Sequence, residues 1–216
     1  EGQRAEQIHI AYHGPASYAR ARMIGVKITP FAIEVSKGGV KGYHSVFYVK
    51  ANSPYQTIAD LKGKNIGLVD PNSMSGNNAP RFALNAMKIK PEDFFGKVVY
   101  TGSHVNAVMA LNQGTVDVAA NWWNNENDSE LQRLVDKGMV KKEDFRMIFK
   151  SDQIVNSPLA YLDSLPADLK KKIAQAFFDA PQKDKAAFDK LSDGKMEPFQ
   201  PVTHEAYLPV VELNRF

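Results

Sequence analysis

The sequence predicts an α/β fold in which short strands alternate with helices. Short apolar segments rich in β-branched and aromatic residues recur along the chain, and segments with helical periodicity lie between them. Turns rich in Gly, Pro, Asn, Asp and Ser separate the two kinds of segment. This order favours parallel pairing through right-handed crossovers, and ligands of such sheets bind at the carboxyl ends of strands, beside helix N-termini.

The N-terminal half begins abruptly. Residues 1–7 have the pattern of a helix end and are followed at once by a strand, so we expect earlier elements to be missing. Proline at the first helical position predicts helix starts at Pro15 and at Pro54, the latter capped by Ser53. The expected elements are a strand over 8–12, a helix over 15–23, strands over 27–34 and 43–50, a helix over 55–61, a strand over 65–70, and a helix from 79 to 87.

The C-terminal half continues the alternation and then becomes helical. Ser103 is the predicted N-cap of a helix that follows a short strand. The expected elements are a strand over 97–100, a helix over 104–111, a strand over 116–120, a helix over 128–137, a strand over 145–150, and helices over 166–180, 183–191 and 204–213.

Composition excludes several classes of function. The chain has 216 residues, of which 44% are hydrophobic and 24% charged, which is ordinary for a soluble protein. A net charge of +3 is too small and too dispersed to argue for nucleic-acid binding, and the run Lys170–Lys172 is expected on a solvated helix face. The absence of cysteine removes disulfides, thiol nucleophiles and thiolate-bound metals. No apolar run is long enough to cross a bilayer, and any export signal would lie outside this chain.

The loop over residues 70–78 is the strongest candidate site. It joins a predicted strand to a predicted helix and offers Ser73, Ser75 and Gly76. The first N–H groups of a helix have no internal acceptor and carry partial positive charge, so a tetrahedral oxyanion fits there without a lysine. The competing interpretation is that Ser75 only caps the helix.

Two histidines occupy comparable turns. His104 lies in the first turn of the helix capped by Ser103, where it could donate to an anion held between two such turns. Tyr12 and His13 precede Gly14-Pro15 in a third strand-to-helix turn, from which either could reach a ligand. For each histidine the alternative is an ordinary surface or core role.

Residues 121–127 follow a predicted strand as a polar loop around two tryptophans. The indoles could form the walls of a pocket in which Glu126 meets a ligand cation, and Asp152, at the end of another strand, could meet the same cation. The alternative is that the tryptophans pack beneath the loop.

Enzymatic signatures are absent from the sequence. The glycine-rich phosphate and dinucleotide loops, the Gly-x-Ser-x-Gly elbow and His-Glu-x-x-His do not occur. His9 and His13 lie four residues apart in a strand-like segment, which does not place them together for a metal. We therefore expect no catalysis and no cofactor.

Five short motifs in order resemble the phosphonate-binding periplasmic proteins of ABC transporters. The loop Asp-Pro-Asn-Ser-x-Ser-Gly is the most specific of them, and the resemblance spans most of the chain. The motifs lie at residues 12–16, 42–46, 70–76, 102–104 and 150–152.

The resemblance implies a type II periplasmic binding fold, in which two α/β lobes are joined by two hinge strands and close on a ligand. By resemblance, residues 1–50 and 153–216 form one lobe, incomplete at its N-terminus, and residues 51–152 form the other. The hinge strands would lie near 43–50 and 154–161.

The resemblance also assigns roles to residues. Ser73, Ser75 and the helix start at Gly76 would hold the phosphonate oxygens, with Met74 standing where the family has threonine. His104 would assist, and His13 stands where a tyrosine is expected, beside Tyr12. Asp152 matches one acid used against a ligand ammonium. The second position is Glu126 or Asn124, and Glu126 would favour 2-aminoethylphosphonate whereas Asn124 would equally allow an alkylphosphonate, phosphate or phosphite.

The function implied is capture of a small phosphonate or phosphate-like anion by lobe closure, for an ABC permease of the inner membrane. A periplasmic monomer is expected, with no nucleic-acid partner. The alternatives are a phosphate- or phosphite-binding protein of the same family, a sensory ligand-binding domain of a regulator, and, least favoured, an enzyme on the same two lobes.

Overall fold

The computed structural model describes residues 1–191 and 193–214. The chain divides into two compact units, which are described separately below. Unit 1 consists of Glu1–Gly42 and Val155–Phe216 as far as they are described, and unit 2 consists of Tyr43–Ile154. The expected boundaries at residues 50 and 153 differ from this division mainly by one strand, β3 (Gly42–Lys50), which pairs over residues 44–50 with strands of unit 2.

Unit 1 contains a sheet of four strands in the order β1-β10-β2-β11, and every pairing is antiparallel. The central strand β2 draws its neighbours β10 and β11 from the far end of the sequence, so parallel pairing was the wrong expectation here. The strands are β1 (Ile10–Tyr12), β2 (Ile28–Ser36), β10 (Pro158–Leu162) and β11 (Met196–Pro201).

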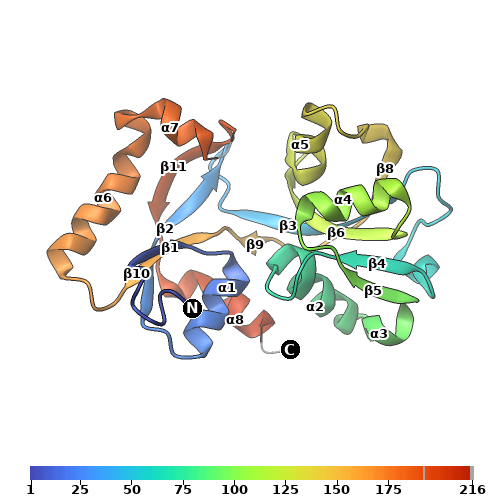
Figure 1. Ribbon diagram of the computed structural model, residues 1–216, viewed down its shortest axis with the longest axis horizontal. Helices are drawn as coiled ribbons and strands as arrows, with labels where there is room; N and C mark the ends of the chain where they lie inside the picture. The colour runs from blue at the N-terminus through green and yellow to red at the C-terminus, as the bar shows by residue number, and fades with distance from the viewer. Residues whose placement is uncertain (192, 215–216) are drawn as a thin grey trace. The chain divides into compact units, whose positions relative to one another are not determined.

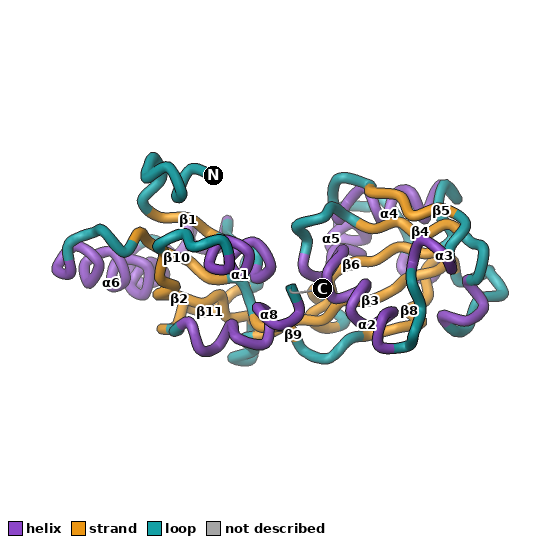
Figure 2. Tube along the Cα trace, turned by 90° about the horizontal axis from the view of Figure 1, so that it is seen from below, coloured by secondary structure: helices purple, strands orange, loops and turns teal. Residues whose placement is uncertain are grey.

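Helices cover both faces of this sheet, and Figures 1 and 2 show α6 and α1 on opposite sides of the strands. On the α6 side Phe31 stacks on Tyr161, with ring centroids 4.6 Å apart. On the α1 side Tyr18 and Tyr207 are fully buried and meet edge to face at 5.0 Å. The helices are α1 (Pro15–Met23), α6 (Ala167–Lys183), α7 (Lys185–Lys190) and α8 (Leu208–Leu213).

Two expectations for unit 1 were wrong. Residues 1–7 form turns rather than a helix end. The C-terminal third is not wholly helical, because β11 lies between α7 and α8. Strand β11 contributes Phe199 to the core, where it packs with Phe177 and Phe188 against the sheet.

Unit 2 contains a mixed sheet in the order β5-β4-β6-β3-β8. The pairs β4–β5 and β4–β6 are parallel, as the strand and helix alternation predicted, whereas β3 runs antiparallel to β6 and β8. The strands are β4 (Asn65–Leu68), β5 (Lys97–Tyr100), β6 (Val118–Asn125), β8 (Phe145–Lys150) and the short β7 (Asp128–Ser129) and β9 (Ile154–Val155).

Alternation along β3 builds two cores. Val46 and Tyr48 pack against α4 and α5, whereas Phe47 and Val49 pack against the face that carries α2 and α3. Figure 1 shows the two pairs of helices on opposite faces of the sheet. The helices are α2 (Ala79–Ala86), α3 (Pro91–Phe94), α4 (His104–Gln113) and α5 (Glu130–Asp136).

Two local predictions in unit 2 were wrong. The helix expected over 55–61 is only a 3-10 turn at Ile58–Leu61, because the Asp60 carboxylate accepts from Thr57 N at 2.9 Å while the Ser53 hydroxyl is used on Lys50 O. Residues 121–125 belong to strand β6 rather than to a loop, because the tryptophans pair with β3.

Candidate anion-binding site

The predicted loop leaves the carboxyl end of β4 and enters a helix through a π-helical turn over Met74–Asn78 that continues into α2. Asp70 shapes its start, since its side chain accepts from Asn72 N at 2.8 Å. The capping residue is Ser73, whose Oγ accepts from Gly76 N at 3.0 Å. The alternative that Ser75 caps this helix was therefore wrong.

The π-helical turn leaves several backbone N–H groups at the start of the helix without an acceptor inside the helix. Its first long bond runs from Asn78 N to Ser73 O, at 3.0 Å. The N–H groups of Met74, Ser75 and Asn77 precede that bond and have no acceptor within the helix. Together with the positive end of the helix dipole, they are suited to an oxyanion.

Gly76 is required by close packing. A Cβ at this position would lie 2.4 Å from Cβ and Cγ2 of Val69 and 2.7 Å from the Ser73 hydroxyl oxygen. The contact is held by a hydrogen bond from Val69 N to Gly76 O, 2.9 Å long. The glycine therefore lets the helix start lie directly against the end of β4.

A chain of serines fixes the other side of the helix start. Ser75 is buried, and its carbonyl accepts from the buried Ser45 hydroxyl at 2.7 Å. Ser45 N in turn donates to Ser151 Oγ at 2.9 Å, and that hydroxyl donates to the carbonyl of Asp152 at 2.7 Å. The structure thus ties the backbone of Asp152, an exposed residue, to the loop through two serines.

His104 lies beside the loop. It is the first residue of α4, whose N-cap Ser103 accepts from Asn106 N as predicted. Its Nε2 lies 3.3 Å from Ser73 Oγ, and its Nδ1 lies 3.0 Å from Oδ1 of the buried Asn121. Among the predicted site residues, Ser73, Met74, Ser75, Gly76 and His104 are therefore brought together.

The neighbours of His104 set its tautomer. Oδ1 of Asn121 also accepts from Trp122 N at 2.9 Å, so it is an acceptor for Nδ1–H of the histidine. Nε2 is then free of a proton in the neutral ring and accepts from the Ser73 hydroxyl. Burial lowers the pKa of His104, against opposing effects of Asn121, Glu130 and Asp70, which favours the neutral ring.

Asn121 was missed as an orienting residue. Its side chain accepts from His104 and also donates from Nδ2 to the His104 carbonyl, at 2.9 Å. The available signal was its position at the carboxyl end of the strand predicted over 116–120, where polar residues of parallel sheets gather.

Tyr12 and His13 belong to unit 1 and are positioned within it. The hydroxyl of the exposed Tyr12 donates to the Glu34 carboxylate. His13 Nε2 lies 2.6 Å from Gln3 Oε1, and burial, together with the N-terminal charge, lowers the pKa of the histidine.

The two positions considered for a second acid differ in their contacts. Asn124 donates from Nδ2 to Asp128 at 3.1 Å. Glu126 lies in the β6–β7 turn and forms an ion pair with Lys142 at 3.1 Å. Glu126 and Trp123 both line a cavity of about 210 Å³. Neither His104 nor any residue of the loop over 70–78 lines this cavity.

The tryptophans have separate roles. Trp122 lies under the Arg133 guanidinium at 4.8 Å and donates to Glu130, while Trp123 lies under the Lys150 ammonium at 4.8 Å. Among the described residues no group of three or more His, Asp or Glu side chains could hold a metal ion. Within residues 1–191 and 193–214, no helix is both long and apolar enough to span a membrane.

Comparison with known proteins gives a consistent result. A family model described as "ABC transporter, phosphonate, periplasmic substrate-binding protein" matches residues 1–207. The phosphonates-binding periplasmic protein of Escherichia coli K12 is 30% identical over 224 aligned positions, which cover 100% of this chain and 63% of that protein. The chain thus spans less than two thirds of the length of this relative.

Solved structures show the same fold. A binding component of an ABC phosphonate transporter from Pseudomonas aeruginosa is 27% identical with a TM-score of 0.81, covering 98% of this chain and 69% of the other. PhnD1 from Prochlorococcus marinus, solved with methylphosphonate, is 19% identical with a TM-score of 0.81 and covers 99% and 80%. The fold is that of type II periplasmic binding proteins, as the sequence predicted.

Proposed function

The chain belongs to the family of periplasmic phosphonate-binding proteins of ABC transporters, and from this premise we propose that it captures a small phosphonate or phosphate-like anion. It would deliver the anion, unchanged, to an ABC permease of the inner membrane. The observation that carries the proposal is the helix start at residues 73–76 with His104 Nε2 at 3.3 Å from Ser73 Oγ. A periplasmic location and a monomeric state are part of the proposal.

The chemistry of the loop suits a tetrahedral anion. A buried dianion is stable only when nearly all its oxygens accept hydrogen bonds. The N–H groups of Met74, Ser75 and Asn77 and the hydroxyl of Ser75 are the proposed donors. Met74 contributes only its backbone, so this loop has one hydroxyl fewer than a loop with threonine there.

His104 and unit 1 complete the proposed site. An anion near Nε2 favours the protonated ring, which would then donate to the ligand rather than accept from Ser73. The family mechanism is closure of two lobes, and Tyr12 and His13 are the proposed donors from unit 1. Closure would create the surface that the permease recognises.

The ligand class follows from the acids. Because Glu126 is already paired with Lys142, we favour an alkylphosphonate or a phosphate-like ion over 2-aminoethylphosphonate. Asn124 is then the proposed neighbour of the ligand's substituent. The exposed Asp152 could still accept from an ammonium, so an amino compound would bind through one acid rather than two.

Calorimetric titration of the full-length protein tests the proposal. The ligands are methylphosphonate, 2-aminoethylphosphonate, phosphate and sulfate, each measured with the parent protein and with Ser75→Ala. Binding of a phosphonate or phosphate in the micromolar range or tighter, weakened by the substitution, is expected. Absence of heat with all four ligands, from protein that unfolds cooperatively, would overturn the proposal.

A further inference from the structure

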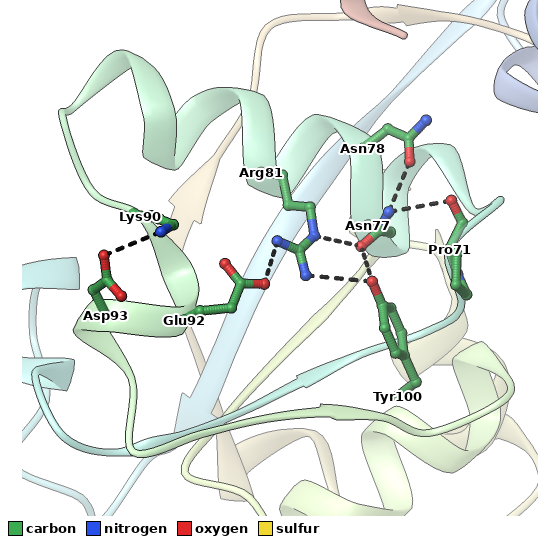
Figure 3. A network of polar contacts seen from close by, with 8 residues as sticks. All are labelled: Pro71, Asn77, Asn78, Arg81, Lys90, Glu92, Asp93 and Tyr100. Atoms are coloured by element: carbon green, nitrogen blue, oxygen red, sulfur yellow. Dashed lines mark hydrogen bonds and ion pairs between the residues drawn. The ribbon is translucent and has the colours of Figure 1, made fainter. Parts of the chain in front are cut away.

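The side chain of Asn77 is a fully hydrogen-bonded polar group behind the loop. It is 6% exposed and all four of its hydrogen-bonding positions are filled. Figure 3 shows it between the start of the loop and the helix that follows. Nδ2 donates to Pro71 O at 3.2 Å and to Asn78 Oδ1 at 2.8 Å, and Oδ1 accepts from Arg81 Nε at 2.9 Å and Tyr100 OH at 3.0 Å.

The partners of Asn77 fix which way its amide points. A guanidinium can only donate, so the atom facing Arg81 is the oxygen. A backbone carbonyl can only accept, so the atom facing Pro71 is the nitrogen. Both ends give the same orientation, and a reversed amide would place donor against donor and acceptor against acceptor.

Asn77 thereby joins the two ends of the loop. Pro71 opens the loop and Asn77 lies six residues later in the π-helical turn, so the bond between them encloses residues 73–76. A buried amide is costly to leave without partners, and the loop cannot open at Pro71 without losing one.

Other elements hold the amide in place. Arg81 comes from α2 and Tyr100 from the end of β5, and the Arg81 Nη2 also donates to the Tyr100 hydroxyl at 3.3 Å. Glu92 of α3 pairs with Arg81 at 2.7 Å. Figure 3 shows Arg81 and Tyr100 meeting at Asn77 and Glu92 bound to the far side of Arg81, so groups outside the loop help to set the orientation of the amide.

We infer that Asn77 is a positioning residue for the anion, held by Arg81 and Tyr100, an inference that rests on the proposed function. It keeps the N–H groups of Met74, Ser75 and Asn77 in the binding arrangement before a ligand arrives. Preorganised donors bind more tightly because the ligand does not have to order them.

The test combines two readouts and a matched control. Asn77→Asp has the same shape and retains the acceptors for Arg81 and Tyr100, but has no donor for Pro71. Asn77→Ala removes all four bonds without adding charge. The control is Lys90→Ala, which removes an exposed ion pair with Asp93 in the same region, drawn in Figure 3, without touching Asn77.

The first readout is amide hydrogen exchange of the ligand-free full-length protein. Ser73 N bonds to Asp70 O and Gly76 N bonds to Ser73 Oγ, so both amides report on the loop. We expect both to exchange at least about tenfold faster in the two Asn77 variants and unchanged in Lys90→Ala. The second readout is calorimetric affinity for methylphosphonate and phosphate. We expect it to fall about 10- to 100-fold in Asn77→Ala, the range found when a residue that orients a metal ligand is replaced.

Each outcome decides something. Unchanged exchange at both amides in both Asn77 variants overturns the inference, whether or not a ligand binds. A lower melting temperature of Asn77→Ala with unchanged affinity also overturns it, since that is the result of a merely structural role. If the parent binds none of the four ligands, the proposed function fails, and exchange alone decides whether Asn77 holds the loop.

Discussion

Replacing Gly76 by alanine tests the close packing on which the helix start depends. The added Cβ would lie 2.4 Å from two side-chain atoms of Val69, about 1 Å inside ordinary van der Waals contact, which begins at 3.4 Å. Neither atom is the end of a flexible side chain, so the helix start must move away from β4 by about that distance. Overpacking of this kind costs about 1–3 kcal/mol.

The expected result is a double effect. For a chain of this size the cost corresponds to a melting temperature about 2–12 °C lower, measured by thermal unfolding of Gly76→Ala. Affinity for methylphosphonate, measured by calorimetry, should fall by at least about tenfold, because a shift of about 1 Å misplaces the backbone donors. Gly14→Ala is the steric control, since the nearest heavy atom to its Cβ is Ser17 Oγ at 4.0 Å and only the change of N-cap residue at α1 affects its stability.

A second substitution makes the reasoning refutable. Val69→Ala removes Cγ2 but keeps the Cβ, which would still lie 2.4 Å from the Cβ added at position 76. Adding this substitution to Gly76→Ala should therefore not restore stability or affinity. A Gly76→Ala variant that melts within about 1 °C of the parent and binds as well would refute the steric argument.

Three further predictions concern other buried groups. Because burial lowers the pKa of His104 from 6.5, its contribution to stability is present above pH 6.5 and is lost as the pH falls through the lower pKa of the folded state. Urea unfolding of His104→Gln at several pH values should therefore show a smaller loss of stability on acidification than the parent shows. An equal loss of stability in the two proteins would contradict this expectation. Arg146→Ala should cost roughly 2–4 kcal/mol in urea unfolding, since the guanidinium donates to three backbone carbonyls within residues 51–55. Tyr207→Phe should cost about 1–3 kcal/mol by leaving the carbonyl of the buried Asn156 without its donor, and an unchanged unfolding midpoint would refute that.

Local signals predicted most of the elements, and the errors occurred where distant segments decide the outcome. Ser103 capped its helix as expected because a cap acts within three residues. The polar residues within 121–125 indicated a loop, but Trp122 and Trp123 pair with β3, which lies far away in sequence. Likewise Ser53-Pro54 predicted a helix start that does not form, because the Asp60 carboxylate accepts from the backbone N–H of Thr57, three residues earlier.

The candidate site divides in the same way. The loop and His104 could be predicted because a strand end followed by a helix start is visible in the sequence. The network around Asn77 could not be predicted, because no sequence motif connects Arg81, Glu92 and Tyr100. These residues meet only when α2, α3 and β5 are packed together. The parallel register of β4 and β5, with Leu68 opposite Tyr100, brings that tyrosine beside the loop.

The strand order of unit 1 has a consequence for biosynthesis. As the chain is made from its N-terminus, β2 appears long before either of its neighbours, β10 at residues 158–162 and β11 at residues 196–201. Unit 2 is continuous in sequence and can complete its sheet in that interval. Until then a largely buried apolar strand lacks the two neighbours with which it pairs in the folded unit, and such a strand is prone to pairing with other chains. We therefore expect truncation before residue 196, which removes β11, to leave a polypeptide prone to aggregation.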